Sequence, residues 1–204
     1  MVKKGFPRPK TTPMAPAKDT KQGILDAAIA VLQTVGTEGM TMRKVAAEAG
    51  MSLGNLQYHY KCKPALLAGL AEHYFAACAS MLDDYQLGPE GGSKKEQLHG
   101  LVAFLLDHVD HISDMCRIFR EMWALAARED AMHGQLIDYY RVVLGKLTGL
   151  LTPLAGGETE ARRMASLLLP YIEGYSITFA ALPESKAEAA QTLTGLCWTL
   201  RRDR

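Results

Sequence analysis

The stretch TMRKVAAEAGMSLGNLQYHYKCK, residues 41–63, decides how the rest of the chain is interpreted. Thr41 and Ser52 are residue types that cap helix N-termini, and Gly50 lies between them, where a tight turn needs a positive φ. The pattern predicts two short helices, over about 41–49 and 52–60. Helices this short are not stable alone. The preceding segment, 20–36, has an apolar face from Ile24 to Val35 on which they can pack.

Helical periodicity continues along the chain, with no alternating pattern long enough for a useful strand. Lys63 and Pro64 open a further helix, because proline suits the first helical turn. The segment QLGPEGGS, residues 86–93, is a clear break. We therefore predict an all-α fold of about nine helices, over roughly residues 20–36, 41–49, 52–60, 63–85, 95–112, 115–130, 131–154, 159–182 and 184–202.

Charge is distributed unevenly along the chain. Residues 1–70 contain 10 Lys and Arg against 4 Asp and Glu, a net of +6, and residues 71–204 contain 13 against 18, a net of −5. This asymmetry indicates a polyanionic partner for the N-terminal third only. We predict a disordered basic arm over 1–18, a DNA-binding domain over 19–66, and a larger helical domain over 67–204.

The cluster LQYHY, residues 56–60, has three possible roles: a buried aromatic corner, a metal or catalytic site, or a contact surface. A metal or a general base is disfavoured, because no carboxylate lies one helical turn from His59. Leu56 and Tyr60 are expected to face inward, Tyr60 against the following helix. The other side chains suit base edges and phosphates in a major groove. The predicted DNA contacts are Thr41, Arg43, Ser52, Leu53, Gly54, Asn55, Gln57, Tyr58, His59 and Lys63.

Two further groups in the C-terminal part carry predictions. Aromatic and apolar residues between the helices predict either an effector cavity or plain core. The last two helices carry more apolar surface than an edge leaves uncovered, which predicts either packing within the chain or a two-fold contact with a second copy. The candidate effector residues are Met115, Phe119, Met122, Trp123, Tyr139, Tyr140, Tyr171 and Tyr175. The candidate dimer residues are Leu168, Ile172, Phe179, Leu193, Leu196 and Trp198.

The cysteines and the His- and Asp-rich segment near residue 110 are interpreted as having no catalytic or cofactor-binding role. Four scattered cysteines indicate free thiols, although Cys62 between two lysines is a possible redox sensor. His108 and His111, with the aspartates at 107, 110 and 114, form either a metal site or a solvated helix face. We expect no metal, no cofactor and no catalytic residue.

The stretch from Thr41 to Leu67 resembles the DNA-binding domain of the TetR family of transcriptional regulators. The shared features are Thr41, the Ala-Gly-Met-Ser turn at 49–52, Gly54, Leu56, the aromatic–His–aromatic run at 58–60, and Lys63. Gln57 stands where the family usually has an aromatic residue, and Tyr60 where it usually has Phe. The segment REMWALAARED, residues 120–130, also resembles the betaine-regulator-like branch, on a weaker match.

The resemblance implies a ligand-responsive repressor that binds a palindromic operator in double-stranded DNA as a homodimer, and that a small-molecule effector releases. We expect such a protein in the cytoplasm, because the chain has no apolar segment of membrane-spanning length and no signal peptide at its N-terminus. Two alternatives remain at this point: a constitutive DNA-binding regulator without an effector, and a helical enzyme or small-molecule carrier.

Overall fold

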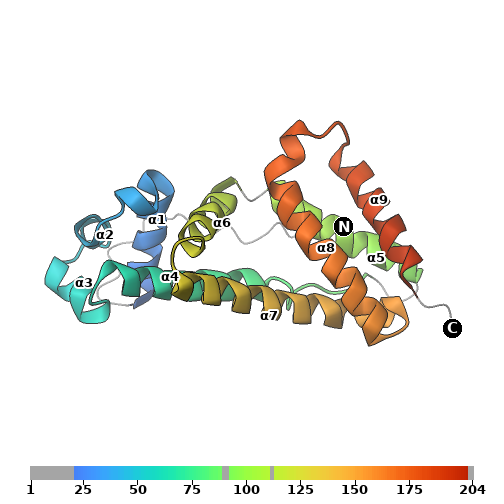
Figure 1. Cartoon of the computed structure of the whole chain (residues 1–204), viewed down its shortest axis with the longest axis horizontal. Helices are drawn as coiled ribbons and strands as arrows, with labels where there is room; N and C mark the ends of the chain where they lie inside the picture. Colours follow the sequence, from blue (N-terminus) through green and yellow to red (C-terminus); the bar gives the residue numbers. More distant parts are fainter. Residues whose placement is uncertain (1–20, 89–91, 111–112, 202–204) are drawn as a thin grey trace. The chain divides into compact units, whose positions relative to one another are not determined.

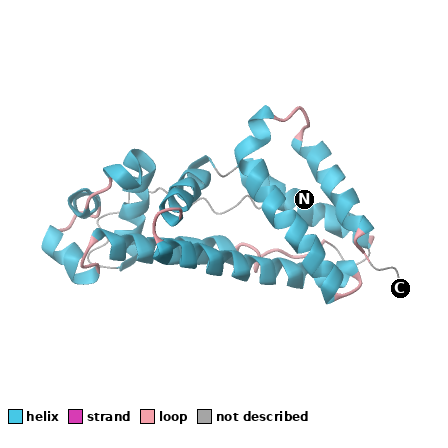
Figure 2. Ribbon diagram, in the orientation of Figure 1, coloured by secondary structure: helices cyan, strands magenta, loops and turns pink. Residues whose placement is uncertain are grey.

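A computed structural model describes residues 21–88, 92–110 and 113–201, with the backbone alone over 108–110 and 113–117. All regular structure in these residues is helical, as Figures 1 and 2 show, which confirms the predicted all-α fold. The helices are α1 (Lys21–Gly39), α2 (Met42–Glu48), α3 (Leu53–His59), α4 (Lys63–Ser80), α5 (Lys94–Asp110), α6 (Ser113–Ala126), α7 (Asp130–Ala155), α8 (Glu158–Thr178), the 3-10 helix η1 (Phe179–Ala181) and α9 (Lys186–Thr199).

The chain divides into two compact units between Leu70 and Ala71, a boundary that falls inside α4. The first unit contains α1, α2 and α3. Their apolar faces are buried, with Ile24, Val45 and Leu56 each fully inaccessible to solvent. Val35, at the end of the predicted α1 face, is instead 38% exposed. The backbone leaves helical geometry just after it, at Gly36, where φ is 69°.

The core of the second unit is formed by α5, α7, α8 and α9. The turn between α7 and α8 uses Gly156 at a φ of 87°, a conformation that favours glycine. Helix α9 packs mainly on α5, where His99 contacts the Thr194 hydroxyl at 3.2 Å and Lys186 pairs with Asp107 at 2.7 Å. Helix α8 packs mainly on α7, so the facing sides of α8 and α9 touch little.

The last two helices end and begin differently from the sequence-based expectation. Helix α8 ends at Thr178 and passes into η1, so that Leu182 is extended rather than helical. Helix α9 begins at Lys186 because Ser185 and Glu188 form a capping box: the Ser185 hydroxyl accepts from the Glu188 amide, and the Glu188 carboxylate accepts from the Ser185 amide. None of the described helices combines the length and the apolar character that spanning a membrane requires.

Candidate functional site

The turn between α2 and α3 is built as predicted. The Thr41 hydroxyl accepts from the Lys44 amide and the Ser52 hydroxyl accepts from the Asn55 amide, each at 3.2 Å. Gly50 takes a φ of 67°, which lets the Met51 amide donate to the Ala46 carbonyl at 2.9 Å. Each short helix therefore has a side-chain cap at its N-terminus, and the turn between them is closed by a backbone hydrogen bond.

Helix α3 has one buried face and one open face. Leu56 is fully buried, whereas Tyr58 is 84% exposed and Gln57 is exposed beside it. The Tyr58 and His59 rings meet edge to face with centroids 5.3 Å apart. A Cβ on Gly54 would meet no atom within 4 Å, so backbone is accessible there. Nothing acidic stands on this face. The open face therefore presents aromatic and amide groups that can contact phosphates and hydrogen-bond the base edges in a groove of duplex DNA.

The remaining predicted DNA residues differ in accessibility. Thr41, Arg43 and Ser52 are exposed at or near the N-termini of α2 and α3. Leu53, Asn55 and His59 are partly exposed. These positions are compatible with a role at the interface, with Leu53 and Asn55 in the first turn of α3.

Lys63 makes a contact within the first unit that the sequence did not predict. Its ammonium donates to the Thr37 carbonyl at 2.5 Å, just after the bend at Gly36. Lys63 therefore holds the start of α4 against the end of α1, and its contact with phosphate stays a prediction, because an ammonium has three donors. Sequence periodicity cannot reveal this contact, because the two residues are 26 positions apart.

Tyr60 packs against the following helix, as predicted. The ring lies so close to Gly69 of α4 that a Cβ added there would be 2.7 Å from Tyr60 Cε1 and 3.2 Å from the hydroxyl oxygen. Real Cβ atoms do not approach other atoms at 2.7 Å, so Gly69 is needed for the ring to seat. Tyr60 thus positions α3 on α4 and does not face outward with Tyr58.

Gly69→Ala is expected to lower the free energy of unfolding by about 1–3 kcal/mol, because the added methyl group displaces the Tyr60 ring. In a Tyr60→Ala background the same substitution should stabilise by up to about 1 kcal/mol, since alanine favours helix over glycine. Urea unfolding of the four proteins in this cycle measures both values. Equal effects of Gly69→Ala in the two backgrounds would contradict the packing.

The aromatic residues predicted to bind an effector form one cluster in the second unit, apart from Tyr171 and Tyr175. The Tyr139 ring centroid lies 4.7 Å from that of Phe75, 5.3 Å from Phe119 and 5.1 Å from Tyr140. Trp123 and Phe119 have centroids 6.4 Å apart. Met122 is fully buried and is core. The side chain of Met115 lies outside the residues that the structure describes.

A hydrogen-bonded chain crosses this cluster from α6 to α8. The Trp123 indole donates to the Tyr140 hydroxyl at 2.9 Å, and that hydroxyl hydrogen-bonds the Glu173 carboxyl. Burial raises the pKa of Glu173 to about 7, an effect that the Tyr140 hydrogen bond partly offsets. Sequence analysis missed Glu173. Its one signal was a carboxylate between apolar positions on a helix with an apolar face.

The pKa of Glu173 predicts a loss of stability with rising pH. The folded protein keeps this proton up to about pH 7, whereas the unfolded chain loses it near the usual value of 4.5. Stability from this group is therefore greatest at low pH and falls between about 4.5 and 7, by about 3 kcal/mol. Glu173→Gln should remove that fall. Denaturant unfolding at pH 5 and pH 8 tests it, with the exposed Glu184→Gln as control. A pH-independent difference between Glu173→Gln and wild type would refute the prediction.

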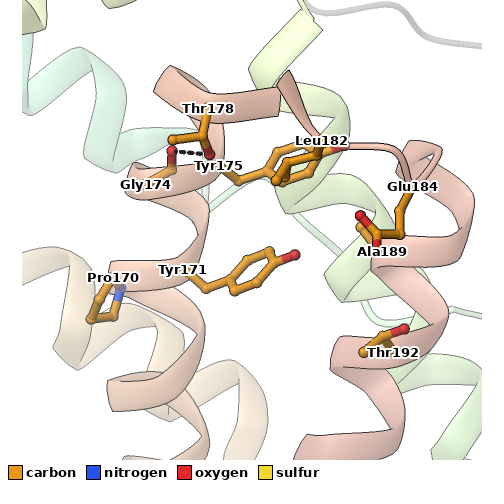
Figure 3. A pocket seen from close by; sticks show the side chains of 9 residues that line it. All are labelled: Pro170, Tyr171, Gly174, Tyr175, Thr178, Leu182, Glu184, Ala189 and Thr192. Carbon is orange, nitrogen blue, oxygen red and sulfur yellow. Dashed lines mark hydrogen bonds between the residues drawn. The ribbon is translucent and has the colours of Figure 1, made fainter. Parts of the chain in front are cut away.

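Tyr171 and Tyr175 lie elsewhere, on the side of α8 that faces α9. Figure 3 shows them at a groove between these helices, with Glu184, Ala189 and Thr192 on the other side; Leu182 also lines it. The groove has a volume of about 460 Å³. The Tyr175 ring lies between Tyr171 and Phe179, with centroids 5.9 Å and 6.2 Å away. The structure thus divides the predicted effector residues between two places.

The predicted dimer residues also divide. Leu168 and Leu193 are buried within the second unit's own core, so they are not available to a second copy. Ile172 and Trp198 pack partly against that core, and the Arg201 guanidinium lies 4.5 Å from the Trp198 ring centroid. Phe179 and Leu196 are 42% and 50% exposed. Other large apolar side chains exposed in this part of the chain are Tyr171 and Ile177 on α8 and Leu182 just after η1.

The described residues contain no group of three metal-binding side chains. Asp107 pairs with Lys186, while the side chains of His108, Asp110, His111 and Asp114 lie outside the described part. Cys62, Cys78 and Cys197 are free thiols. Burial raises the pKa of Cys78 to about 12 and that of Cys197 to about 11, which keeps both protonated and unreactive.

Comparisons with known proteins agree with the helix-turn-helix geometry. Residues 24–70 match the model of bacterial regulatory proteins of the tetR family. An HTH-type transcriptional regulator in the dhlA 5′ region of Xanthobacter autotrophicus is 43% identical over 173 residues, which covers 85% of this chain and 86% of that protein. These matches do not test the narrower resemblance to the betaine-regulator branch, which stays a prediction.

Solved structures share the fold. A transcriptional regulator from Rhodococcus sp. Rha1 superposes with a TM-score of 0.70 at 21% identity, covering 90% of this chain and 98% of that one. FadR from Bacillus subtilis, in complex with stearoyl-CoA, has a TM-score of 0.65 at 16% identity, covering 90% and 100%. With the sequence match over most of its length and the exposed face of α3, this chain belongs to the TetR family and is a DNA-binding transcriptional regulator.

Proposed function

We propose that the protein is a repressor that binds a palindromic operator as a homodimer and is released from DNA by a small-molecule effector. The observation that carries this proposal is the open face of α3, on which Gln57 and Tyr58 project from a helix whose other face is buried. Helices of this kind enter the major groove of DNA. Residues 19–66 would then be the DNA-binding domain and residues 67–204 the effector-binding and dimerisation domain, working in the cytoplasm.

The exposed apolar residues of α8, η1 and α9 support the homodimer. Phe179 of η1 and Leu196 of α9 are about half exposed, and Tyr171, Ile177 and Leu182 are further exposed large apolar residues in this part of the chain. A contact between copies along α8 and α9 would cover them and build a four-helix bundle. Two reading helices placed about 34–36 Å apart would then reach successive major grooves of a palindrome.

The aromatic cluster with Glu173 supports an effector. Tyr139 and Tyr140 are neither fully buried nor fully exposed, and a carboxylate stands among the rings. An effector can release DNA only by binding more tightly to a state that does not fit the operator. A fold relative, FadR, was solved with stearoyl-CoA, which supports ligand binding by proteins of this fold. The alternative, a constitutive regulator, requires that the cluster be core alone.

The experiment is a mobility-shift titration of the purified protein against its own upstream DNA at several salt concentrations. A sequence-specific shift at physiological salt supports the proposal, and its absence contradicts self-regulation. Arg43→Ala should lower the slope of log affinity against log salt concentration by about 1 per DNA-bound subunit. The reason is that each phosphate contact releases counterions on binding, and the variant makes one contact fewer. Gln57→Ala should change sequence preference and leave that slope unchanged.

A further inference from the structure

Glu173 is a partly buried carboxylate beside two tyrosines of the aromatic cluster, Tyr139 and Tyr140. Its hydroxyl partner is Tyr140, and its charge also acts on the Cys78 thiol of α4 and the Tyr139 hydroxyl of α7. In the part of the chain that the structure describes, no lysine, arginine or histidine pairs with it. A carboxylate removed from water without a cation is energetically unfavourable, and none of the described residues supplies that positive charge.

The aromatic cluster to which Tyr139 and Tyr140 belong adds a second attraction for a cation. Tyr139 contacts Phe75, Phe119 and Tyr140 through its ring, with centroids 4.7–5.3 Å apart. Aromatic faces carry negative electrostatic potential and attract cations within about 6 Å. They also accept the apolar part of a ligand. Tyr139, Tyr140, Trp123 and Glu173 are each only partly buried, so the cluster is reachable from solvent.

We propose that this site binds a small aromatic cation, whose amidinium, guanidinium or ammonium group pairs with the Glu173 carboxylate while its ring lies against the aromatic cluster. Tyr140 can keep its hydrogen bond, because a carboxylate accepts about four. A planar cation with two parallel donors suits the carboxylate best. This inference rests on the proposed function, because it names the chemical class of the effector.

The groove between α8 and α9 is the competing location. It also contains a carboxylate, Glu184, and aromatic rings, Tyr171 and Tyr175. Glu184 is exposed, however, so water already solvates its charge and a cation gains little there. The two glutamates therefore provide matched variants for deciding between the sites.

The test is isothermal titration calorimetry of the full-length protein, without DNA, at pH 8. The probes are benzamidine, benzamide and benzoate, which share one ring and differ in charge. Wild type should prefer benzamidine to benzamide by at least tenfold and bind benzoate weakest. Glu173→Gln should abolish that preference, Glu173→Asp should retain part of it, and Glu184→Gln should leave it unchanged. An unfolding temperature of Glu173→Gln no lower than that of wild type confirms an intact fold.

A pH series adds a readout that a structural role would not change. Burial raises the pKa of the facing thiol, Cys78, and of the facing hydroxyls, Tyr139 and Tyr140, so these groups stay neutral from pH 6 to 8. Glu173, with a pKa of about 7, alone changes charge among them. Benzamidine affinity of wild type should fall roughly tenfold from pH 8 to pH 6, and that of Glu173→Gln should not.

The inference is overturned if benzamidine binds no tighter than benzamide, if the preference survives in Glu173→Gln, or if Glu184→Gln alone removes it. Because DNA is absent, these outcomes concern the effector class only. A protein that shifts operator DNA but shows no benzamidine preference would keep the proposed regulator and lose this ligand. A protein that binds benzamidine through Glu173 but shifts no operator DNA would keep the ligand proposal and lose the proposed regulator.

Discussion

Leu196→Asp is expected to convert the protein from a dimer to a monomer at micromolar concentration. Leu196 is 50% exposed on α9, on the edge that we propose to face a second copy. In a two-fold contact each aspartate would be buried against the same surface of the partner, and both copies carry the substitution. Like charges and desolvation together cost several kcal/mol, which corresponds to at least a hundredfold weaker dimer.

Sedimentation equilibrium measures this change, and Val142→Asp is the control. Val142 is 49% exposed on α7, so its substitution introduces the same charge at a matched exposure away from the α8–α9 edge. Val142→Asp should stay dimeric. Operator affinity should fall with Leu196→Asp at concentrations where it is monomeric, because one subunit reaches one half-site. If both variants behave like wild type, the proposed dimer surface is wrong.

Leu56→Ala is expected to lower stability and Tyr58→Ala to lower operator affinity, although the two residues are only two positions apart. Leu56 is fully buried, so its truncation should lower the free energy of unfolding by about 2–5 kcal/mol. Tyr58 is 84% exposed, so its removal should change stability by less than about 0.5 kcal/mol. Tyr58→Ala should instead weaken operator binding at least tenfold, because both subunits of the dimer lose the contact.

Chemical denaturation and mobility-shift titration separate these effects. The decisive comparison is Tyr58→Ala at a temperature where it is fully folded. Unchanged operator affinity in that variant would show that α3 does not dock through its open face. A large loss of stability in Tyr58→Ala would show that the ring packs within the protein. His59→Ala, whose ring meets Tyr58 edge to face, should produce a smaller loss of affinity.

Local sequence pattern was sufficient to predict the DNA-reading unit. The caps at Thr41 and Ser52, the glycine turn, and the inward Leu56 and Tyr60 all agree with the structure. These features depend on residues within one or two helical turns of each other, and such short-range preferences are visible in the order of the residues. The roles of the outward residues in binding DNA stay predictions.

Sequence could not distinguish buried from exposed apolar residues where burial depends on which distant helix packs against them. Leu193 and Leu196 are both apolar and one turn apart on α9, yet Leu193 is 1% exposed and Leu196 50%. The reason is that α9 lies on α5 and barely on α8, which only the packing of distant helices determines. The same holds for Leu168, which we expected at a dimer surface and which is core.

Lys63 and Glu173 show that the environment of charged residues, too, depends on tertiary packing. By sequence alone Lys63 is a cation beside a DNA-reading helix, and Glu173 is one carboxylate among many in an acidic domain. The fold brings Thr37 to Lys63 across 26 positions, and it brings Tyr140 and Cys78 to Glu173 from two other helices. Sequence therefore determined the helical class and the faces of α3, because these follow from local periodicity, and it indicated the family through the motif at 41–67. Tertiary structure alone decided which charged groups are buried and which have hydrogen-bond partners, because both depend on segments that are far apart in the chain.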